Sequence, residues 1–361
     1  MAGFAAAFAL LAYAFRSADL GGIRHLLAGA PALLLTPVFY LVVLACDALG
    51  WRRLVLSPEP PPPWRRLLAV RTAAEALGLS LPSGGVLAEA TAVMLLHKRC
   101  DVPAGPAVAS LAARRFYIFL SFGLYLSASA VAGFSLLAAI SPRVIGRAGL
   151  QWVVPASAAF VLAVALGLRA MLLGGALGER VHRLLHRLPW KRLRAWLDRK
   201  VEVFTDADRL VEAALAGGGA AGRADRARTA RTAGEPRRAA AAIAATAARL
   251  APFLGIWLAE SCETFFIMTL LGAGLSFRQV FSFEGLLTFI RGLAFFLPSG
   301  LGIQDLGYLA FLKGLGVNQA VTLTAAFVLV KRSKEVFWIM IGYLLLARQA
   351  WRPRRGSGPP P

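Results

Sequence analysis

The sequence predicts an all-α polytopic membrane protein with about six spans and two inverted re-entrant (broken) helical hairpins around a central polar cavity. Three observations predict this fold. The chain of 361 residues is 58% hydrophobic and only 16% charged, whereas soluble domains contain about 25% charged residues. Several apolar runs are long enough to cross about 30 Å of hydrocarbon. The helix-breaking sequence Leu-Pro-Ser-Gly occurs twice inside such runs, at Leu81–Gly84 and Leu297–Gly300.

The net charge of +21 comes from basic residues that lie mainly in the connections between apolar runs. Basic connections mark the cytoplasmic side of a membrane protein and attract anionic lipid headgroups. We therefore expect membrane lipids with an anionic or polar headgroup, and no nucleic acid, as partners. Cys46, Cys100 and Cys262 are scattered, without the spacing of a disulfide framework or a metal site, so we predict no metal and no cofactor.

The N-terminal membrane half is predicted to cover residues 1–176. Residues 1–15 form an apolar but short first span, because they lack the basic start and small-residue cleavage site of a signal peptide. A clearer span, Ala30–Leu49, ends at an interfacial tryptophan and two arginines. The proline-rich connection Ser57–Pro63 cannot be helical, and the arginines that flank it place it in the cytoplasm. The other elements of this half are the first broken hairpin at residues 67–97 and spans at Phe116–Ile140 and Trp152–Leu173.

Charged residues interrupt the first broken hairpin. Arg71 and Glu75 are four residues apart, so they share a helix face and can form an ion pair. Glu89 follows the break. At the start of the next span, Arg114 and Arg115 are expected to be snorkelling residues that reach the membrane interface.

The middle of the chain, residues 177–248, has a different composition. Basic residues alternate with Leu, Trp and Val at helical spacing over residues 179–204, as expected of an amphipathic helix on an anionic membrane face. Ala213–Ala248 is rich in Ala, Gly and Arg and is predicted to be a loose helix or linker. Together with the basic tail at residues 348–361, this segment predicts a multi-pass protein of the cell inner (cytoplasmic) membrane with both termini in the cytoplasm.

The C-terminal membrane half begins with a span, Arg249–Leu275, that carries Glu260 and Glu263 on one face. These carboxylates either contribute to a polar site or form salt bridges with Arg291 or Lys331. This half is predicted to cover residues 249–347, with the second broken hairpin at residues 280–316.

The last apolar run carries Lys331, Arg332, Lys334 and Glu335. A charge at the bilayer centre costs about 2.5–3.5 kcal/mol on insertion scales, so such residues usually face a partner or a wet cavity. The alternative is a helix that starts later, with these charges at its interfacial end. Because Val336–Ala347 is too short to span a bilayer alone, we favour charges inside the membrane.

The repeated Leu-Pro-Ser-Gly sequence is followed by an acidic residue seven positions after each proline, Glu89 in the first copy and Asp305 in the second. With all basic segments in the cytoplasm, the two copies enter the membrane from opposite sides, as inverted repeats of many secondary transporters do. The alternative is coincidence in a chain rich in these residue types. A half-helix that begins after each break, capped by Ser83 or Ser299, would present N–H groups to an anion such as a phosphate or carboxylate.

These patterns predict a binding site for a charged or polar-headed substrate. Cations of the last helix would supply countercharge, and the carboxylates would balance them or carry protons. We predict no catalytic residues, because no nucleophile elbow, phosphate-binding loop or pair of catalytic carboxylates is present in the sequence. The predicted substrate-binding residues are Ser83, Gly84, Glu89, Arg291, Ser299, Gly300, Gln304, Asp305, Lys331, Arg332, Lys334 and Glu335. Their predicted charge partners are Arg71, Glu75, Glu260 and Glu263.

The segments Phe295–Tyr308 (FFLPSGLGIQDLGY) and Leu329–Glu335 (LVKRSKE) resemble the flippase-like family called the lysylphosphatidylglycerol synthase transmembrane region. They are most similar to its hopanoid-biosynthesis-associated, HpnL-like branch. Glu75–Gly85 is similar to an earlier element of the same family, and the resemblance covers nearly all of the chain outside the linker. Three positions depart from the family pattern: Asp305 stands in place of Glu, Leu306 stands in place of Gly, and Leu79 lies near the position where an Asn is expected.

The resemblance implies a lipid transporter or flippase-like protein that moves or binds a polar-headed lipid between leaflets, such as a hopanoid, a phospholipid or a glycolipid intermediate. The synthase activity in the family's name belongs to a separate soluble domain, so we expect no enzyme activity. One alternative is a non-catalytic accessory or scaffold subunit of a lipid-biosynthesis complex. Another is a membrane-embedded headgroup transferase with Asp305 or Glu335 as a base. The expected assembly is a homodimer or a lipid-biosynthesis complex.

Overall fold

The computed structural model describes residues 12, 15–56, 62–81, 84–173, 210, 215, 235–294 and 300–351. This part of the chain contains helices and connections but no strand, so the all-α prediction is confirmed. The helices, in chain order, are α2 (Leu20–Ala28), the 3-10 helix η1 (Pro31–Leu35), α3 (Thr36–Arg52), α4 (Trp64–Ser80), α5 (Gly84–Cys100), α6 (Ala104–Ile145), α7 (Leu150–Leu173), α12 (Glu235–Leu270), α13 (Phe277–Leu293), α14 (Ile303–Gly314) and α15 (Ala320–Trp351).

Among the described residues, four segments are long and apolar enough to cross a membrane. They are Pro31–Arg52, which joins η1 to α3, Ala104–Ile145, Leu150–Leu172 and Ile243–Leu270. The chain is therefore a polytopic membrane protein, as predicted. α15 has 32 residues, which corresponds to about 48 Å, so it is also long enough to cross, although it carries charges along its middle.

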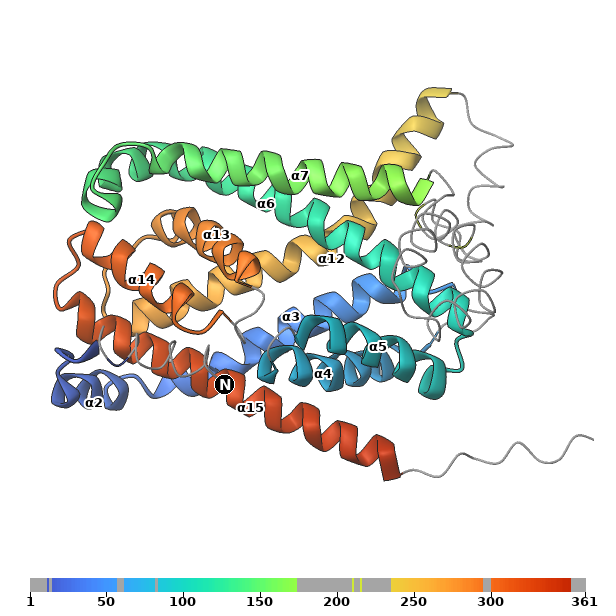
Figure 1. The fold of residues 1–361 in the computed structure, drawn as a ribbon, viewed down its shortest axis with the longest axis horizontal. Coiled ribbons are helices and arrows are strands. Elements are labelled where there is room, and N and C mark those ends of the chain that lie inside the picture. The colour runs from blue at the N-terminus through green and yellow to red at the C-terminus, as the bar shows by residue number, and fades with distance from the viewer. Residues whose placement is uncertain are drawn as a thin grey trace, which may run out of the picture.

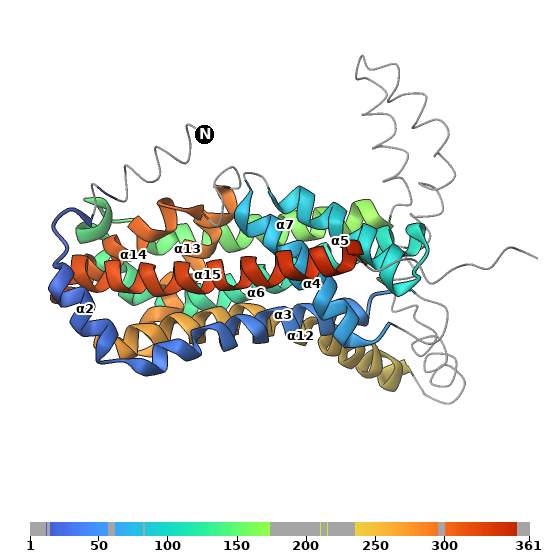
Figure 2. The ribbon, with the colours of Figure 1, turned by 90° about the horizontal axis from the view of Figure 1, so that it is seen from below.

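Both predicted broken hairpins exist as pairs of short helices. α4, α5 and α13 have 17 residues each and α14 has 12, so their lengths are about 18–26 Å, less than a full hydrocarbon core of about 30 Å. α4 packs against α5, and α13 packs against α14. Figure 1 shows the α13–α14 pair toward one end of the bundle and the α4–α5 pair toward the other, and Figure 2 shows the same arrangement from below.

The sequence explains where each hairpin breaks. Leu81 precedes a proline and is extended (φ −110°, ψ 143°), which ends α4, because a residue before proline is sterically disfavoured in the helical region. α5 begins at Gly84, whose backbone lies so close to the end of α4 that a Cβ would not fit. On the second hairpin, Gly300 and Gly302 have φ values of 63° and 85°, a backbone conformation that glycine adopts at little cost.

α12 packs against α3, α6 and α13 and lies beside α3 along one side of the bundle in Figure 2. The rings of Phe122 on α6 and Trp257 on α12 have centroids 4.5 Å apart. The Trp257 indole N–H donates to Ser121 Oγ at 2.9 Å, which satisfies a polar atom that burial would otherwise leave unpaired. These contacts hold α12 in register against α6, and α12 carries Glu260 and Glu263.

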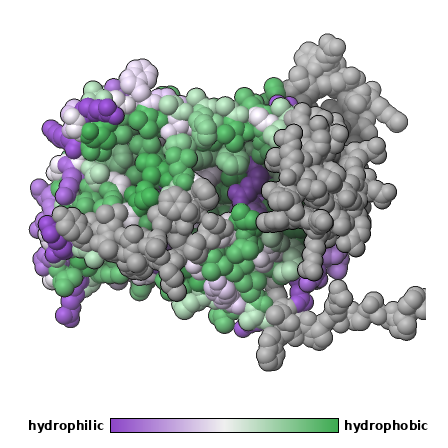
Figure 3. Space-filling model, in the orientation of Figure 1, coloured by the Kyte–Doolittle hydropathy of each residue, from purple (hydrophilic) through white to green (hydrophobic). Residues whose placement is uncertain are grey.

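Apolar side chains cover much of the outer surface. Val131 is 82% exposed and Leu344 is 62% exposed, a degree of apolar exposure that suits contact with lipid chains. Figure 3 shows hydrophobic residues over the middle of one face, hydrophilic residues toward its ends, and a recessed hydrophilic patch near its centre. The surface therefore suits a protein that is surrounded by hydrocarbon and has a polar interior.

The structure describes the predicted linker, residues 177–248, only at residues 210, 215 and 235–248. Residues 235–248, which the sequence predicts to be a loose helix or linker, are helical and form the first part of α12. Their alanine-rich composition explains this, because alanine has the highest intrinsic helix propensity.

Other sequence-based predictions lie outside the described residues. They are almost all of the first span (1–15), the amphipathic helix at 179–204, the tail from residue 352, and the capping residues Ser83 and Ser299.

A close helix contact between α15 and α4 depends on Gly342. A Cβ at this position would lie 2.5 Å from Ala76 Cβ and 2.6 Å from the Thr72 carbonyl oxygen. Gly342→Ala should therefore lower the free energy of unfolding by about 1–3 kcal/mol through overpacking, measured by thermal unfolding in detergent micelles. The control is Gly167→Ala on α7, where no atom lies within 4 Å of the added Cβ; equal melting temperatures for the two variants would contradict the role of this contact.

Candidate functional site

Asp47 on α3 is the centre of a first group of buried charges. Its carboxylate accepts hydrogen bonds from Arg71 Nε on α4 at 2.7 Å and from Arg114 Nε and Nη2 on α6, each at 2.6 Å. The exposed fractions of Asp47, Arg71 and Arg114 are 4%, 5% and 3%. One carboxylate therefore joins three helices. We call this group the N-terminal cluster; its members are Asp47, Arg71, Glu75, Glu89, Arg114 and Arg115.

The other carboxylates of the N-terminal cluster lie on the first broken hairpin. Arg71 Nη2 donates to Glu75 Oε2 at 2.7 Å, so the predicted pair between these residues is confirmed. Glu89 on α5 accepts from Arg114 Nη1 at 3.0 Å and also from Arg115. The half-helix that follows the first break is thus tied to α6 through its carboxylate.

The prediction that Arg114 is a snorkelling residue at the interface is wrong. α6 begins at Ala104, so Arg114 lies about 15 Å inside the helix rather than at its end. Arg115 has a side chain that is 39% exposed, but it is also bound to Glu89. Asp47 was missed as a site residue, although it is the single charged residue of the apolar run Ala30–Leu49, which is the signal that could have identified it.

A second group of buried charges surrounds Lys331 on α15. Lys331 Nζ donates to Tyr308 OH at 2.7 Å and to Thr264 Oγ1 at 3.3 Å, and it lies 3.4 Å from Glu284 Oε1. Tyr308 OH in turn donates to Glu284 at 2.8 Å. These side chains come from α12, α13, α14 and α15, so one ammonium group connects four helices. Gln304, a predicted site residue, lies beside this group and donates to Tyr308 OH at 3.3 Å.

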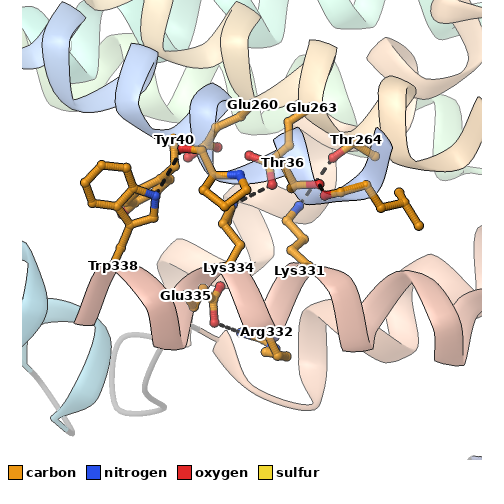
Figure 4. Close-up of polar contacts among 12 residues, drawn as sticks. Thr36, Tyr40, Glu260, Glu263, Thr264, Lys331, Arg332, Lys334, Glu335 and Trp338 are labelled. Atoms are coloured by element: carbon orange, nitrogen blue, oxygen red, sulfur yellow. Dashed lines mark hydrogen bonds and ion pairs between the residues drawn. The ribbon is translucent and has the colours of Figure 1, made fainter. Parts of the chain in front are cut away.

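Glu260 and Glu263 on α12 are each paired with a cation. Lys334 Nζ donates to Glu263 Oε1 at 2.5 Å, and both side chains are buried. Arg291 on α13 lies 3.2 Å from Glu260. The salt-bridge alternative is therefore confirmed for Glu260 with Arg291, whereas Glu263 pairs with Lys334 (Figure 4).

Arg332 lies next to the second helix break. Its Nη2 donates to both oxygens of Asp305, at 2.7 and 2.8 Å, and its Nη1 donates to Glu335 at 2.7 Å. Asp305 Oδ2 also accepts from the backbone N–H of Gly302 at 3.0 Å. The protein's own carboxylate therefore satisfies one of the N–H groups at the start of α14. We call the C-terminal cluster the group Glu260, Glu263, Glu284, Arg291, Asp305, Lys331, Arg332, Lys334 and Glu335.

The position of these charges within α15 decides between the two interpretations of the last apolar run. α15 begins at Ala320, so Lys331 lies about three turns inside the helix. The alternative of a helix that starts later is wrong. Figure 4 shows Lys331 and Lys334 pointing from α15 toward the carboxylate and hydroxyl groups of α12 and α3.

Tyr40 on α3 connects the two clusters. Its hydroxyl donates to Glu75 Oε1 of the N-terminal cluster at 3.0 Å. Lys334 Nζ of the C-terminal cluster lies 4.8 Å from the centroid of its ring, a favourable cation–π distance. The ring of Trp338 lies 6.0 Å away and restricts the ring of Tyr40 further (Figure 4).

The two clusters differ in charge. The N-terminal cluster contains three arginines and three carboxylates. The C-terminal cluster contains four cations and five carboxylates, and Arg332 is shared by two of the carboxylates. Each cation that the sequence proposed as countercharge for a substrate is already paired within the protein. A charged ligand would therefore bind by sharing or replacing one of these partners.

The structure brings most of the predicted site residues together. Gly300 packs directly on Arg291, with a Cβ position 2.6 Å from Arg291 Cγ, and Gly84 lies at the tip of the other hairpin. Besides Asp47, the sequence analysis did not predict Glu284, Tyr308, Tyr40 or Thr264 as site residues. Glu284 had a signal, because it is a lone carboxylate in an apolar run. The missed residues without such a signal are Tyr40, Thr264 and Tyr308, whose hydroxyl groups are ordinary in a membrane helix.

Replacing Asp47 tests the N-terminal cluster. Asp47→Asn removes the charge between two buried arginines, and we expect a loss of about 3–5 kcal/mol in the free energy of unfolding because an uncompensated buried charge is left. The measurement is unfolding by SDS in mixed micelles. Asp101→Asn is the matched control, since Asp101 is exposed, and an equally small effect of both substitutions would rule out the proposed role of Asp47.

Replacing the Tyr40 hydroxyl tests the connection between the clusters. Tyr40→Phe removes the hydrogen bond to Glu75 but keeps the ring beside Lys334, so we expect a loss of about 1 kcal/mol in the same unfolding measurement. Tyr343→Phe is the control, because its hydroxyl makes an exposed contact with Ser80 at 2.8 Å. A larger loss for Tyr343→Phe than for Tyr40→Phe would contradict the prediction.

The chain was compared with known proteins. No curated protein and no solved structure matches it. A family model described as "Lysylphosphatidylglycerol synthase TM region" matches residues 1–330. This match covers most of the chain and includes both broken hairpins and the first part of α15, and with it the family suggested by the sequence motifs is confirmed. The chain belongs to the family of the lysylphosphatidylglycerol synthase transmembrane region.

Proposed function

We propose that this protein binds a polar-headed lipid at the two charged clusters and moves it between the leaflets of the membrane. The observation that carries the proposal is the buried C-terminal cluster beside the second helix break. Charges at membrane depth are costly and are usually associated with a substrate or ion pathway. Membership of a lipid-related family supports the same conclusion.

The pairing of Arg332 supports a site that can exchange partners. One guanidinium group holds both Asp305 and Glu335, so a headgroup could take the place of one carboxylate while the other stays bound. Exchange of this kind keeps Arg332 paired throughout, which avoids an isolated buried cation. If Asp305 is the carboxylate displaced, it still accepts a hydrogen bond from the Gly302 N–H at 3.0 Å. The backbone N–H of Gly302, at the start of α14, adds a polar group beside Arg332, since both donate to Asp305 Oδ2.

The proposal includes an inverted arrangement of the hairpins. The repeated Leu-Pro-Ser-Gly sequence and the opposite ends from which the two hairpins enter the bundle support it (Figure 1). Transporters with this architecture place their substrate where the broken helices meet. We propose a hopanoid, a phospholipid or a glycolipid intermediate as the lipid, since the motifs are most similar to the hopanoid-associated branch of the family.

We place the protein in the cell inner membrane, with the basic end of the bundle in the cytoplasm. Support for this orientation comes from Arg52 and Arg53 at the end of α3, and from Arg65 and Arg66 at the start of α4, because basic residues concentrate on the cytoplasmic side. We also propose that both termini lie in the cytoplasm; for the N-terminus this rests on the sequence-based prediction that residues 1–15 form a first span. We further propose that the protein is not an enzyme, and that it works as a homodimer or with a lipid-biosynthesis complex.

A dithionite-quench assay in proteoliposomes tests lipid movement. The purified protein should expose fluorescent phospholipid of the inner leaflet to the quencher, and Lys331→Ala/Arg332→Ala should reduce this movement to the level of empty liposomes. The control is Arg24→Ala/Lys313→Ala, which removes two exposed cations elsewhere and should move lipid like the unaltered protein.

A further variant separates transport from folding. Asp305→Asn/Arg332→Gln removes both members of a pair, so it leaves fewer unpaired charges than the single substitution Arg332→Gln and should be more stable in thermal unfolding. It should still fail to move lipid if Arg332 binds the headgroup. Background-level movement by the unaltered protein for every labelled lipid class would refute the proposal and favour an accessory subunit.

A further inference from the structure

One arginine of the N-terminal cluster, Arg71, has a buried N–H donor without a hydrogen-bond partner among the described residues. Arg71 uses Nε for Asp47 and Nη2 for Glu75. Its third nitrogen, Nη1, is buried and has no hydrogen-bond partner among the described residues, although the residue as a whole is only 5% exposed. A buried donor without a partner costs about 1–3 kcal/mol, more for a charged group. A ligand with an acceptor atom bound to Arg71 Nη1 would remove this cost.

A second arginine of the N-terminal cluster, Arg115, lies at the surface of the protein. Arg115 donates to Glu89, and its side chain is nevertheless 39% exposed. Arg115 and Arg114 share Glu89, and Arg114 and Arg71 share Asp47, so the three guanidinium groups belong to one connected group of ion pairs. The cluster therefore has a buried donor at Arg71 and an accessible guanidinium group at Arg115.

The surface next to Glu89 is open and apolar. Gly85 and Val86 precede Glu89 by four and three residues, so they share its face of α5, one turn nearer the break. No atom lies within 4 Å of a Cβ built on Gly85, and Val86 is 75% exposed. A molecule with a charged head and apolar chains could place its head on the arginines and its chains along this face.

We infer that the N-terminal cluster is a second ligand site, which binds a phosphate group through Arg71 and Arg115. Guanidinium groups only donate hydrogen bonds, and their geometry matches phosphate oxygens. The cluster has three arginines and three carboxylates, so a phosphate must compete with a carboxylate for one arginine. Arg115 is the arginine that can turn, because it is the exposed one and Glu89 keeps Arg114 as a partner.

This inference deepens the proposed function and rests on it, since it names the phosphate of a phospholipid as the group recognised by the first hairpin. Two sources carry that chemistry: a lipid headgroup and free phosphate. The difference between them is the apolar part, which the exposed face of α5 would bind only in a lipid.

Equilibrium binding to the purified full chain in detergent tests the inference without any transport. The probes are short-chain phosphatidylglycerol, a short-chain diacylglycerol that lacks phosphate, and inorganic phosphate, each titrated by calorimetry.

Arg115→Gln should weaken phosphatidylglycerol binding about tenfold, the value of one charge-assisted hydrogen bond. Arg71→Gln should weaken it at least as much, and Arg115→Gln covers the case in which the Arg71 variant does not fold. Arg65→Gln, an exposed arginine on the same helix as Arg71, should leave it unchanged.

The outcomes are distinct. Displacement of phosphatidylglycerol by inorganic phosphate alone, at similar concentrations, would support the site and assign it to free phosphate. Equal affinity for the diacylglycerol, or unchanged affinity in the Arg115→Gln variant, would overturn the inference and leave water as the partner of Arg71. Phosphatidylglycerol binding that depends on Arg115, in a protein that moves no lipid, would reject the proposed transport and keep this site.

Discussion

The buried charges of this protein are paired with opposite charges, and the arrangement of the helices depends on this pairing. Inside a membrane, apolar packing alone gives little reason for one helix to prefer another, because lipid chains are as apolar as leucine. Paired charges give such a reason, since a partner that is lost leaves an uncompensated charge at a cost of about 3–5 kcal/mol. Asp47 joins three helices in this way, and Lys331 joins four.

The two broken hairpins are held in place by the same pairing of buried charges. Their helices have 17, 17, 17 and 12 residues and are shorter than a full membrane span, so the charged side chains that they carry need polar neighbours within the bundle. Glu89 of the first hairpin is held by α6, and Glu284 and Asp305 of the second are held by α15. Ion pairs thus fasten both hairpins to the long helices. A ligand that takes over one member of a pair would loosen that attachment. The displaced charge stays paired only where it has a second partner, as Glu89 has in Arg114 and Arg115.

Tyr40 makes the two clusters a single structural unit. Its hydroxyl is bound to Glu75, and its ring lies beside Lys334, so a shift of α3 changes both ends of the polar interior. The clusters are not equivalent, however. The N-terminal cluster is balanced in charge and has an unused donor, whereas the C-terminal cluster has one carboxylate more than it has cations.

The sequence by itself determined the class of the protein, the location of the helix breaks and the depth of the charges in α15. These features follow from local chemistry: apolar runs of spanning length, proline and glycine at the breaks, and a final apolar run too short without its charged part. The i, i+4 pair of Arg71 and Glu75 is local in the same sense. Only the tertiary structure decided which distant charges meet. Arg114 and Asp47 are 67 residues apart, and Lys334 and Glu263 are 71 apart; such partners are chosen by helix packing, and the spacing of residues along the chain does not contain that information.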